Sequence, residues 1–429
     1  MRIEPAREVR GDVAVPGVKG ISQRAVLLGA VADGESVIRG FGRAADTESA
    51  ILAVRALGVE VKDEDVDVVR VHGAGLRGLR APDAPIDCGN AGTVMRLLTG
   101  LLAGQEGRFE LAGDESLSAR PQERVAVPLR QMGATIETTD GHAPVVIEGS
   151  ALHAIRYELP VASAQVKTAV LFAGLYADGG PTAVVEPLPS RDHTERLLPA
   201  LGARVQRGAR EVLVWPVDRL RPLDLDVPGD FSAAAPFVVA AALVPGSELR
   251  VHSVNVNPTR AHLLDVLERM GVRVAVFNRR TVGGESVADV EVRSHDRALQ
   301  ATTIGRDEVP LLVDELPLFA LAAGLARGES IVYGAEELRF KESDRIDTVT
   351  EALRSIGIRI EARPDGFRIR GVPNRPAGGR IEAHGDHRIA MLGAVAGLVS
   401  RDGVDVEGAE SVAISFPGFF DLLESVERR

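Results

Sequence analysis

Lysine is scarce in this chain, which makes the position of each lysine informative. Of the 50 basic residues only four are lysine, at positions 19, 62, 167 and 341, and the rest are arginine. Lys19 lies in "VPGVKGISQRA", a turn rich in proline and glycine that precedes an apolar helix. A lysine ammonium is a compact charge that can serve two anions and transfer a proton, whereas a guanidinium is broad and stays protonated. Lys19 is therefore the first candidate catalytic residue.

Polar residues also gather at the first turns of helices that are otherwise apolar. Capping explains the Ser, Thr, Asn and Asp residues, because these side chains accept hydrogen bonds from the free N–H groups of a helix start. It does not explain the cations, which face the positive end of the helix dipole. A bound phosphate or carboxylate would explain them. The residues are Lys19, Arg24, Asn90, Thr93, Arg96, Ser163, Gln165, Lys167, Asp230, Ser232, Asp314, Glu315, Asp386, His387 and Arg388.

Two further polar clusters add candidates. "RFKESDRI" (339–346) predicts an exposed helix that begins with Lys341, Glu342 and Arg345, with the two cations four residues apart on one face. A carboxylate between cations ionises easily, so Glu342 is either part of an ion-pair cluster or a catalytic acid–base group. "GDESLSARPQERV" (113–125) is a polar segment long enough to act as a lid.

Six apolar helices, rich in small residues, must position these side chains, and helices apolar on nearly all sides are buried ones. A second type of helix ends in a glycine step into a strand, where the glycine is expected to be left-handed. The apolar helices are predicted at 22–34, 92–104, 164–179, 231–246, 315–328 and 386–403. The glycine steps are at Gly58, Gly133, Gly202, Gly271 and Gly357, and a sixth such helix, 416–427, has no strand after it.

Short β-branched runs such as 66–72 and 211–217 lie between the helices, so each of the six units is an α/β module. Six units divide naturally as three plus three. "DVAVPGVKG" and "LDVPGDFS" resemble each other and predict crossovers between two domains near 13–18 and 225–230. The N-terminal domain is then 16–227, and the C-terminal domain is 1–15 with 228–429. A linear solenoid of α/β repeats is the alternative.

Composition excludes several classes of protein. A net charge of −11 argues against a general nucleic-acid surface. The longest apolar run, 233–244, is shorter than the ~18 residues of a membrane span, and the N-terminus has no apolar signal region. A single cysteine, Cys88, excludes an internal disulfide and predicts a packing role in a cytoplasmic protein. His384 and His387 lack structural-metal spacing, and phosphate-loop and dinucleotide-binding motifs are absent, so neither metal nor cofactor is expected.

Eight motifs, in order over nearly the whole chain, resemble the 5-enolpyruvylshikimate-3-phosphate (EPSP) synthase family: "GVKGISQRA", "GNAGTVMR", "GDESLSARP", "VASAQVKTA", "SRDHTE", "DELP", "FKESDRI" and "GDHRIAM". The resemblance implies an inside-out α/β barrel of two domains, each with three βαβαββ repeats, buried parallel helices and outer sheets. It also implies that a monomer transfers the enolpyruvyl group of phosphoenolpyruvate to the 5-hydroxyl of shikimate 3-phosphate, in the shikimate pathway to chorismate and the aromatic amino acids. Phosphate is released from a tetrahedral intermediate.

The resemblance further implies roles for residues of this chain. The implied catalytic residues are Asp314 as base near the 5-hydroxyl and Glu342, or alternatively Lys19, as proton donor to the methylene carbon. Shikimate 3-phosphate is expected to contact Lys19, Gly20, Arg24, Ser163, Ala164, Gln165, Arg191, Asp314 and Lys341. Phosphoenolpyruvate is expected to contact Lys19, Asn90, Gly92, Arg120, Gln165, Arg345 and Arg388.

This chain departs from the family pattern at several positions. Gly20 stands where relatives often have serine, so only its backbone N–H can contribute, and Ala164 lacks a hydroxyl that many relatives have. Ile414 replaces a lysine of some relatives. Family members bind glyphosate at the phosphoenolpyruvate site, which implies sensitivity here because Gly92 leaves space; Leu97 stands where many sensitive relatives have proline.

Two other functions are weighed against this interpretation. The sister enolpyruvyl transferase that acts on UDP-N-acetylglucosamine carries a cysteine in the segment before Arg-Pro, where this chain reads "GDESLSARP". A non-catalytic anion-binding repeat scaffold would explain the cations without requiring Asp314 and Glu342.

Overall fold

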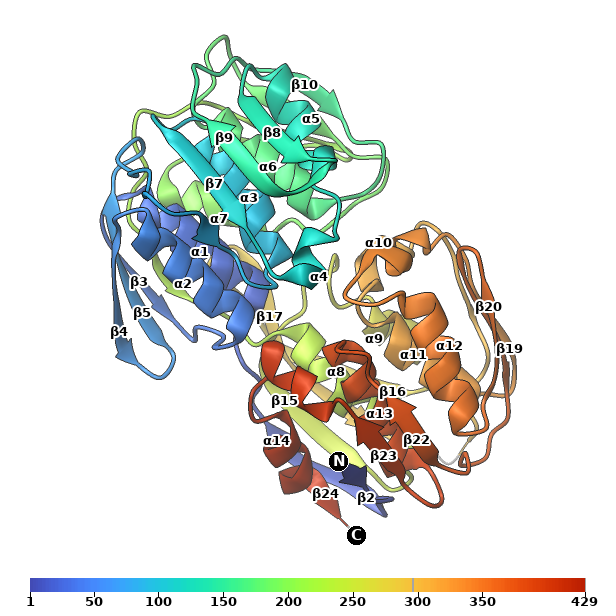
Figure 1. Cartoon of the computed structure of the whole chain (residues 1–429). Coiled ribbons are helices and arrows are strands. Elements are labelled where there is room, and N and C mark those ends of the chain that lie inside the picture. Colours follow the sequence, from blue (N-terminus) through green and yellow to red (C-terminus); the bar gives the residue numbers. More distant parts are fainter. Residues whose placement is uncertain (295–296, 429) are drawn as a thin grey trace. The chain divides into compact units, whose positions relative to one another are not determined.

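The chain divides into two compact units in the structure, a computed structural model that describes residues 1–294 and 297–428 (Figure 1). We call Gly17–Val227 with Val282–Glu285 the N-terminal lobe. We call Met1–Pro16, Pro228–Thr281 and Ser286–Arg429 the C-terminal lobe. Each lobe has its own hydrophobic core of buried aliphatic side chains.

Three sheets of the N-terminal lobe share one strand order, in which the first pair of strands is parallel and the others are antiparallel. The first sheet has β14 (Asp224–Asp226), β3 (Asp33–Arg39), β5 (Val68–Ala74) and β4 (Glu60–Asp65). The second has β6 (Ile86–Asp87), β7 (Arg108–Ala112), β9 (His142–Glu148) and β8 (Thr135–Thr139). The third has β10 (Arg156–Glu158), β11 (Thr182–Val185), β13 (Glu211–Val214) and β12 (Val205–Arg207).

The C-terminal lobe repeats this order once in full and twice with strands from the N-terminal segment. The full copy has β18 (Thr303–Ile304), β19 (Gly328–Val332), β21 (Gly366–Gly371) and β20 (Arg359–Arg363). The second sheet has β16 (Arg273–Val282), β17 (Glu285–Arg293), β15 (Glu248–Asn255), β2 (Glu8–Val13) and β24 (Glu427–Arg428). The third has β1 (Arg2–Ile3), β23 (Val404–Glu407) and β22 (Gly379–Glu382).

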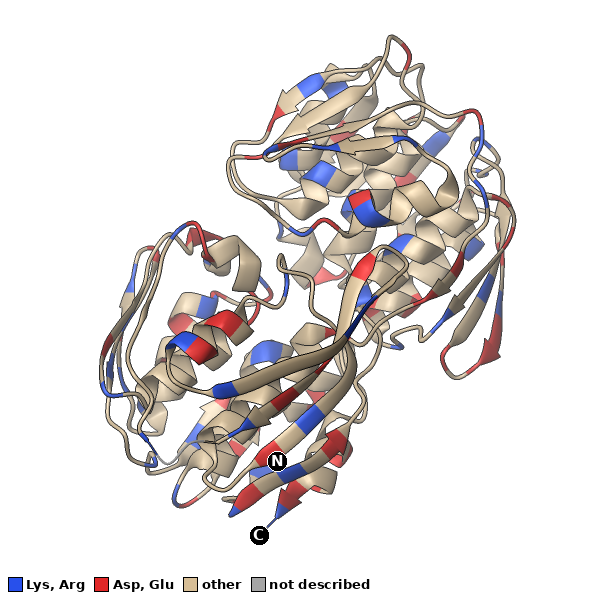
Figure 2. Cartoon of the chain, turned by 180° about the vertical axis from the view of Figure 1, so that it is seen from behind, with Lys and Arg blue, Asp and Glu red and all other residues tan. Residues whose placement is uncertain are grey.

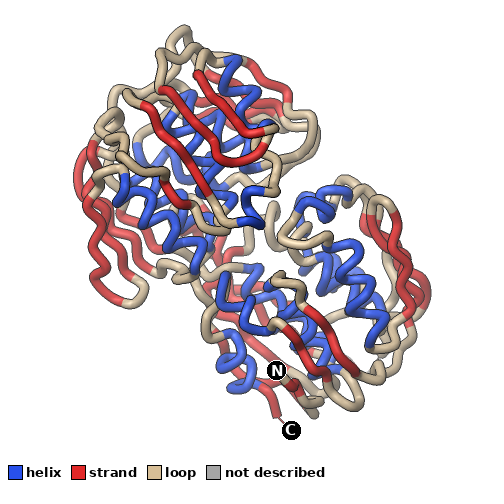
Figure 3. Tube along the Cα trace, in the orientation of Figure 1, coloured by secondary structure: helices blue, strands red, loops and turns tan. Residues whose placement is uncertain are grey.

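Within each lobe the long apolar helices lie inside and the strands outside (Figure 3). The inner helices are α1 (Lys19–Ala30), α3 (Gly92–Leu102), α6 (Ala164–Gly174), α8 (Phe231–Leu243), α11 (Leu316–Gly324) and α13 (His387–Val399). Nearly all their residues are buried, because small and aliphatic side chains cover their whole circumference. The predicted inside-out α/β architecture of six repeats is confirmed.

Helices of the second type alternate with the inner helices along the chain. They are α2 (Ala45–Ala56), α5 (Glu123–Gln131), α7 (His193–Leu197) with the 3-10 turn η1 (Leu198–Leu201), α9 (Leu263–Arg269), α12 (Arg345–Ser355) and α14 (Phe419–Val426). Short elements complete the fold: α4 (Glu115–Ser118), α10 (Val309–Leu312), η2 (Glu336–Phe340) and η3 (Ala409–Ile414). The five predicted glycine steps all have φ between +85° and +100°, which confirms their left-handed conformation.

Some predicted boundaries shift in the structure. The first buried helix begins at Lys19, so this lysine is the first helical residue and does not lie in a turn before the helix. The polar segment 113–125 contains the helical turn α4, capped by Asp114, whose carboxylate accepts a hydrogen bond from the N–H of Leu117 at 2.8 Å. Among the described residues no helix has the length and apolarity needed to cross a membrane. Acidic and basic residues are interspersed over both lobes (Figure 2).

Candidate active site

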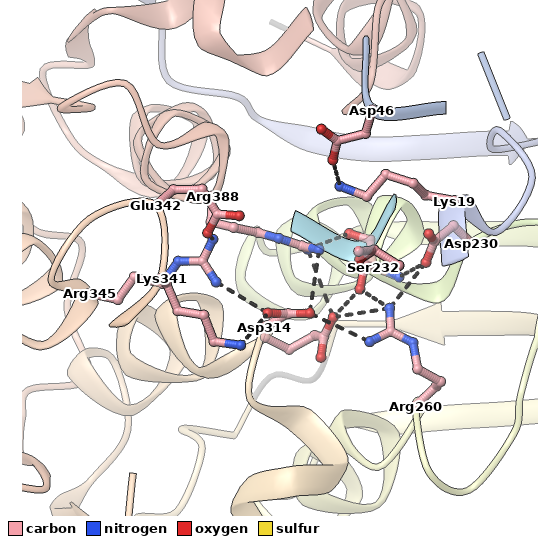
Figure 4. Close-up of polar contacts among 12 residues, drawn as sticks. Lys19, Asp46, Asp230, Ser232, Arg260, Asp314, Lys341, Glu342, Arg345 and Arg388 are labelled. Atoms are coloured by element: carbon pink, nitrogen blue, oxygen red, sulfur yellow. Dashed lines mark hydrogen bonds and ion pairs between the residues drawn. The ribbon is translucent and has the colours of Figure 1, made fainter. Parts of the chain in front are cut away.

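Four basic side chains contact the carboxylate of Asp314, which lies between α10 and α11 (Figure 4). Arg345 donates a hydrogen bond of 3.2 Å to Oδ1, and the ammonium of Lys341 lies 3.9 Å from the same oxygen. Oδ2 lies 3.7 Å from a nitrogen of Arg260 and 3.9 Å from one of Arg388. Four cations therefore surround this one carboxylate.

Arg345 is fully buried and anchors this cluster. Its Nε donates to Asp386 at 2.8 Å and its Nη2 donates to Glu342 at 2.6 Å. Burial by itself lowers the pKa of the Arg345 guanidinium, but the neighbouring carboxylates of Asp386 and Glu342 outweigh burial and raise the pKa. The buried Asp386 has a lowered pKa for the complementary reason, because the charge of Arg345 outweighs its burial. Arg345 is therefore a permanent cation in this site.

Arg260 is a functional candidate that the sequence analysis missed. It is buried, it lies 3.2 Å from the carboxylate of Asp230, and it also donates to the hydroxyl of Ser232. Ser232 in turn donates to the fully buried Glu315. The preceding "NVNPT" forms tight turns in which the side-chain oxygen of Asn257 accepts from the N–H of Thr259 at 3.0 Å. Asparagine and proline at this density indicate a turn, and this turn signal is the only feature of the local sequence that draws attention to Arg260.

The C-terminal lobe already contains carboxylate partners for its cations. Arg260, Lys341, Arg345 and Arg388 lie among Asp230, Asp314, Glu315, Glu342 and Asp386. The sequence predicts a bound anion as the missing partner of such cations, but in this lobe neighbouring carboxylates supply the opposite charge.

Lys341 and Glu342 lie in a loop, which corrects the predicted helical face. Helix α12 begins only at Arg345, because the side chain of Asp344 caps it by accepting from the N–H groups of Ile346 and Asp347 at 3.1 and 3.3 Å. Lys341 and Arg345 nevertheless reach the same oxygen of Asp314. Glu342 is about one quarter exposed, so it lies at the accessible side of the cluster.

In the N-terminal lobe, Lys19 pairs with Asp46 on α2 at 2.6 Å (Figure 4). Both side chains are partly exposed, and the pair joins the starts of α1 and α2. The sequence alone does not predict Asp46 as the partner of Lys19. An ion pair at this position holds the lysine side chain in place while leaving part of the ammonium accessible.

Arg24 donates all three of its described hydrogen bonds to uncharged acceptors. These are the hydroxyls of Thr194 and Thr168 at 2.8 and 3.0 Å and the carbonyl of Gly20 at 2.8 Å. The pKa of the Arg24 guanidinium is lowered to about 10, mainly by burial and in part by the positive charge of the nearby Arg191, although the carboxylate of Glu195 acts in the opposite direction. A buried arginine whose described acceptors are neutral, with a second arginine nearby, makes an environment that would accept a phosphate.

Gln165 connects α6 with α3. Its amide oxygen accepts from Arg96 at 2.6 Å, and its amide nitrogen donates to the hydroxyl of Thr93 at 2.9 Å. Ser163 caps α6 by accepting from the N–H of Val166, and Ala164 follows as the first helical residue. The first turns of the buried helices therefore meet within this lobe, as α8, α11 and α13 meet in the other through Ser232, Glu315 and Arg388.

Asn90 and Arg120 are joined next to the start of α3. Arg120 donates to the side-chain oxygen of Asn90 at 2.7 Å and to the hydroxyl of Ser116 at 3.0 Å. The amide nitrogen of Asn90 donates to Asp114 at 2.8 Å. A Cβ built on Gly92 would lie 3.0 Å from a guanidinium nitrogen of Arg96 and 3.4 Å from one of Arg120. Gly92 therefore leaves room beside two cations.

Lys167 is not a residue of the candidate site, although the sequence places it among the polar residues at the helix starts. Its ammonium is buried and lies 2.8 Å from Glu186 and 2.7 Å from Glu195. Breaking such a buried pair leaves an uncompensated charge, which is strongly destabilising. Lys167 is therefore a structural lysine.

Cys88 is buried beside the Asn90 turn and is expected to be inert. Burial, and then the charge of Asp87, raises the pKa of its thiol to about 12. Only about one thiol in 10⁴ is ionised at pH 8 with this pKa, and the thiolate is the reactive form. We predict no alkylation of the native protein by iodoacetamide at pH 8 in one hour, measured by intact mass. Full labelling in denaturant is the control, and rapid native labelling would contradict the packing role.

Known proteins resemble this chain over nearly its full length. A family model for EPSP synthase (3-phosphoshikimate 1-carboxyvinyltransferase) matches residues 3–423. The chain belongs to the EPSP synthase family. The 3-phosphoshikimate 1-carboxyvinyltransferase of Alkalilimnicola ehrlichii is 49% identical over 98% of this chain and 94% of its own length. The enzyme of the same description from Acidithiobacillus ferrooxidans is 48% identical over 97% of this chain and 95% of its own length.

Solved structures of the family have the same fold. The EPSP synthase of Acinetobacter baumannii superposes with a TM-score of 0.88 at 40% identity, over 99% of this chain and 97% of that one. The enolpyruvyl transferase NikO of Streptomyces tendae has a TM-score of 0.78 at 20% identity, over 99% of this chain and 96% of that one, which shows a shared fold alone. The predicted resemblance to the EPSP synthase family is confirmed.

Proposed function

We propose that this chain is a 3-phosphoshikimate 1-carboxyvinyltransferase of the shikimate pathway. The 5-hydroxyl oxygen of shikimate 3-phosphate bonds to C2 of phosphoenolpyruvate, its proton goes to a base, and the methylene carbon of phosphoenolpyruvate gains a proton. The resulting tetrahedral intermediate loses phosphate by cleavage of its C–O bond, and the new methyl group returns a proton. Atoms balance without a cofactor. Family membership over residues 3–423 supports this reaction.

The Asp314 cluster is the observation that carries the mechanism. Asp314 accepts the proton of the 5-hydroxyl, as the carboxylate that Lys341, Arg345 and Arg388 surround. Arg345 and Arg388 bind the anionic groups of phosphoenolpyruvate and stabilise the charge that develops during addition. Glu342 delivers the proton to the methylene carbon, and Lys19 is the competing donor.

We propose that the binding residues have the roles that the family pattern implies. Arg24 and Arg191 bind the phosphate of shikimate 3-phosphate, which the neutral hydrogen-bond acceptors of Arg24 and the repulsion between the two cations favour. The other contacts to this substrate are Lys19, the N–H of Gly20, Ser163, Ala164, Gln165, Asp314 and Lys341. The contacts to phosphoenolpyruvate are Lys19, Asn90, Gly92, Arg120, Gln165, Arg345 and Arg388.

A phosphate-release assay with both substrates tests the function. Turnover with phosphoenolpyruvate and shikimate 3-phosphate, and none with UDP-N-acetylglucosamine, supports the proposal. Turnover only with the sugar nucleotide would reassign the chain to the sister transferase. Binding without phosphate release would leave an anion-binding scaffold.

Gly92→Ala tests the phosphoenolpyruvate site through inhibition by glyphosate. The new methyl group presses on the guanidinium groups of Arg96 and Arg120, so the inhibition constant is expected to rise about tenfold or more, with a smaller rise in KM for phosphoenolpyruvate. Gly208→Ala is the matched control, because a Cβ there would meet only the carbonyl of Glu211 at 3.4 Å. An inhibition constant that stays the same in Gly92→Ala would place the inhibitor elsewhere.

The domain division and the state in solution are also part of the proposal. We propose two domains, 16–227 and 228–429 with 1–15, in a cytoplasmic monomer that binds neither nucleic acid nor membranes. Sedimentation equilibrium measures the mass, and fractionation of cells measures the location.

A further inference from the structure

The turn of the β16–β17 hairpin belongs to the N-terminal lobe, although both strands lie in a sheet of the C-terminal lobe. Gly283 and Gly284 form this turn with φ of +55° and +80°. A Cβ on Gly284 would lie 2.7 Å from the carbonyl oxygen of Arg196, and one on Gly283 would meet the side chain of Leu225. Two glycines therefore allow a close approach of the turn to α7 and β14.

Glu285, the residue after these glycines, is buried and paired with His193. Nδ1 of His193 lies 2.7 Å from Oε1 of Glu285, and each residue is 3% exposed. The carboxylate accepts from Nδ1–H, which fixes the tautomer and the orientation of the ring. Arg196 donates to the carbonyl of Gly284 at 3.0 Å, so the turn is held to α7 at two points.

Helix α7 begins at His193, two residues after Arg191. Its second residue, Thr194, accepts the hydrogen bond of the Arg24 Nε at 2.8 Å. The other side of the His193 ring faces α1, because a Cβ on Gly20 would lie 3.9 Å from the ring carbon Cδ2. His193 thus lies between Glu285 and the start of α1. A helix of five residues is too short to hold its own orientation without such contacts.

The charge of Glu285 also acts on Arg24. Burial lowers the pKa of Arg24, while the carboxylates of Glu195 and Glu285 act in the opposite direction. Glu285 therefore helps to keep Arg24 charged in its buried position beside Arg191.

We infer that Glu285, acting through His193, positions Arg24, Arg191 and the start of α1 to bind the phosphate of shikimate 3-phosphate. This inference rests on the proposed function. Glu285 is a positioning residue, since it acts on the substrate site through His193 and lies outside every motif that the family resemblance uses. Without its carboxylate the imidazole loses the acceptor that orients it, and the short α7 loses its anchor.

Glu285→Gln tests the inference, because glutamine keeps the shape and removes the charge. Titration calorimetry with shikimate 3-phosphate alone is expected to give a Kd about tenfold higher than wild type. In steady-state assays the KM for shikimate 3-phosphate rises by a similar factor, while the KM for phosphoenolpyruvate changes by less than about twofold. A purely structural role would lower the melting temperature without this split between the two KM values.

Two further variants serve as controls. Glu35→Gln makes the same change in a partly exposed pair, where Glu35 lies 2.9 Å from Nε2 of His72, and it is expected to leave both KM values unchanged. His193→Asn places an amide nitrogen near the position of Nδ1 and retains the bond to Glu285. It is expected to bind shikimate 3-phosphate nearly as wild type does, whereas His193→Leu binds it about tenfold more weakly.

Each outcome decides a separate point. If the wild-type protein does not bind shikimate 3-phosphate, the proposed function fails and the inference fails with it. If wild type binds and folded Glu285→Gln binds equally well, or if both KM values rise together, the inference alone is overturned. If Glu285→Gln does not fold, the pair His193→Asn and His193→Leu decides: a difference in affinity supports positioning, and equal affinity overturns it.

Discussion

Asp314→Asn is expected to lower kcat by about 10³-fold, within the range of a positioned acid–base group. Asparagine keeps the size of the side chain but cannot accept the proton of the 5-hydroxyl. The loss of negative charge also frees Arg345 and Arg388 to bind anions more strongly, since both now contact this carboxylate. The KM for phosphoenolpyruvate is therefore expected to stay equal or fall. Phosphate release at saturating shikimate 3-phosphate, with the concentration of phosphoenolpyruvate varied, measures both parameters.

Asp405→Asn is the matched control for this result. Asp405 on β23 also pairs with an arginine, Arg2, at 3.1 Å, but the pair is exposed on an outer sheet. Its removal is expected to leave kcat unchanged, because exposed ion pairs contribute little. A kcat within tenfold of wild type in Asp314→Asn would show that another group accepts the proton.

Lys19→Arg is expected to lower kcat/KM by at least about 10²-fold while the protein stays folded. Arginine can still pair with Asp46, so the junction of α1 and α2 keeps its ion pair. In the proposed mechanism Lys19 lies beside both substrates, where the broad guanidinium cannot occupy the space of an ammonium and does not release a proton. Activity by phosphate release and melting temperature by circular dichroism separate the two effects.

Lys62→Arg provides the comparison, because Lys62 pairs with Glu60 at 3.0 Å on the surface. Its kcat/KM is expected to equal that of wild type. Near-normal turnover by Lys19→Arg would refute the role of Lys19. Loss of the folded state in that variant would point instead to a structural role of the pair with Asp46.

The inner helices and glycine steps could be predicted because their signals are local. Side chains that are apolar around the whole circumference indicate a buried helix wherever they occur. Gly58 and Gly357 show the same local logic, since each ends an outer helix with a positive φ. Pairing of strands in each sheet follows from the same repeated unit.

Contacts between residues far apart in the sequence could not be predicted, because local patterns do not show which segments meet in the fold. Arg260 reaches Asp314 across 54 positions of sequence, and Asp46 reaches Lys19 from another helix. Lys167 lies at the start of a buried helix, as the candidate site residues do, but the two glutamates that pair with it, Glu186 and Glu195, lie on later segments. The error at Lys341 was avoidable, because Asp344 is a good capping residue and places the start of the helix at Arg345.

The exchange of strands between distant parts of the chain has a consequence for biosynthesis. During synthesis on the ribosome, β2 cannot pair with its parallel neighbour β15 before all of Gly17–Val227 has been translated. The N-terminal lobe can gather its core before then, yet His193 meets its partner only 92 residues later. Because synthesis runs from the N-terminus, the rest of the N-terminal lobe is translated before Glu285. The pairing of Glu285 with His193 is therefore a late step in the folding of this lobe.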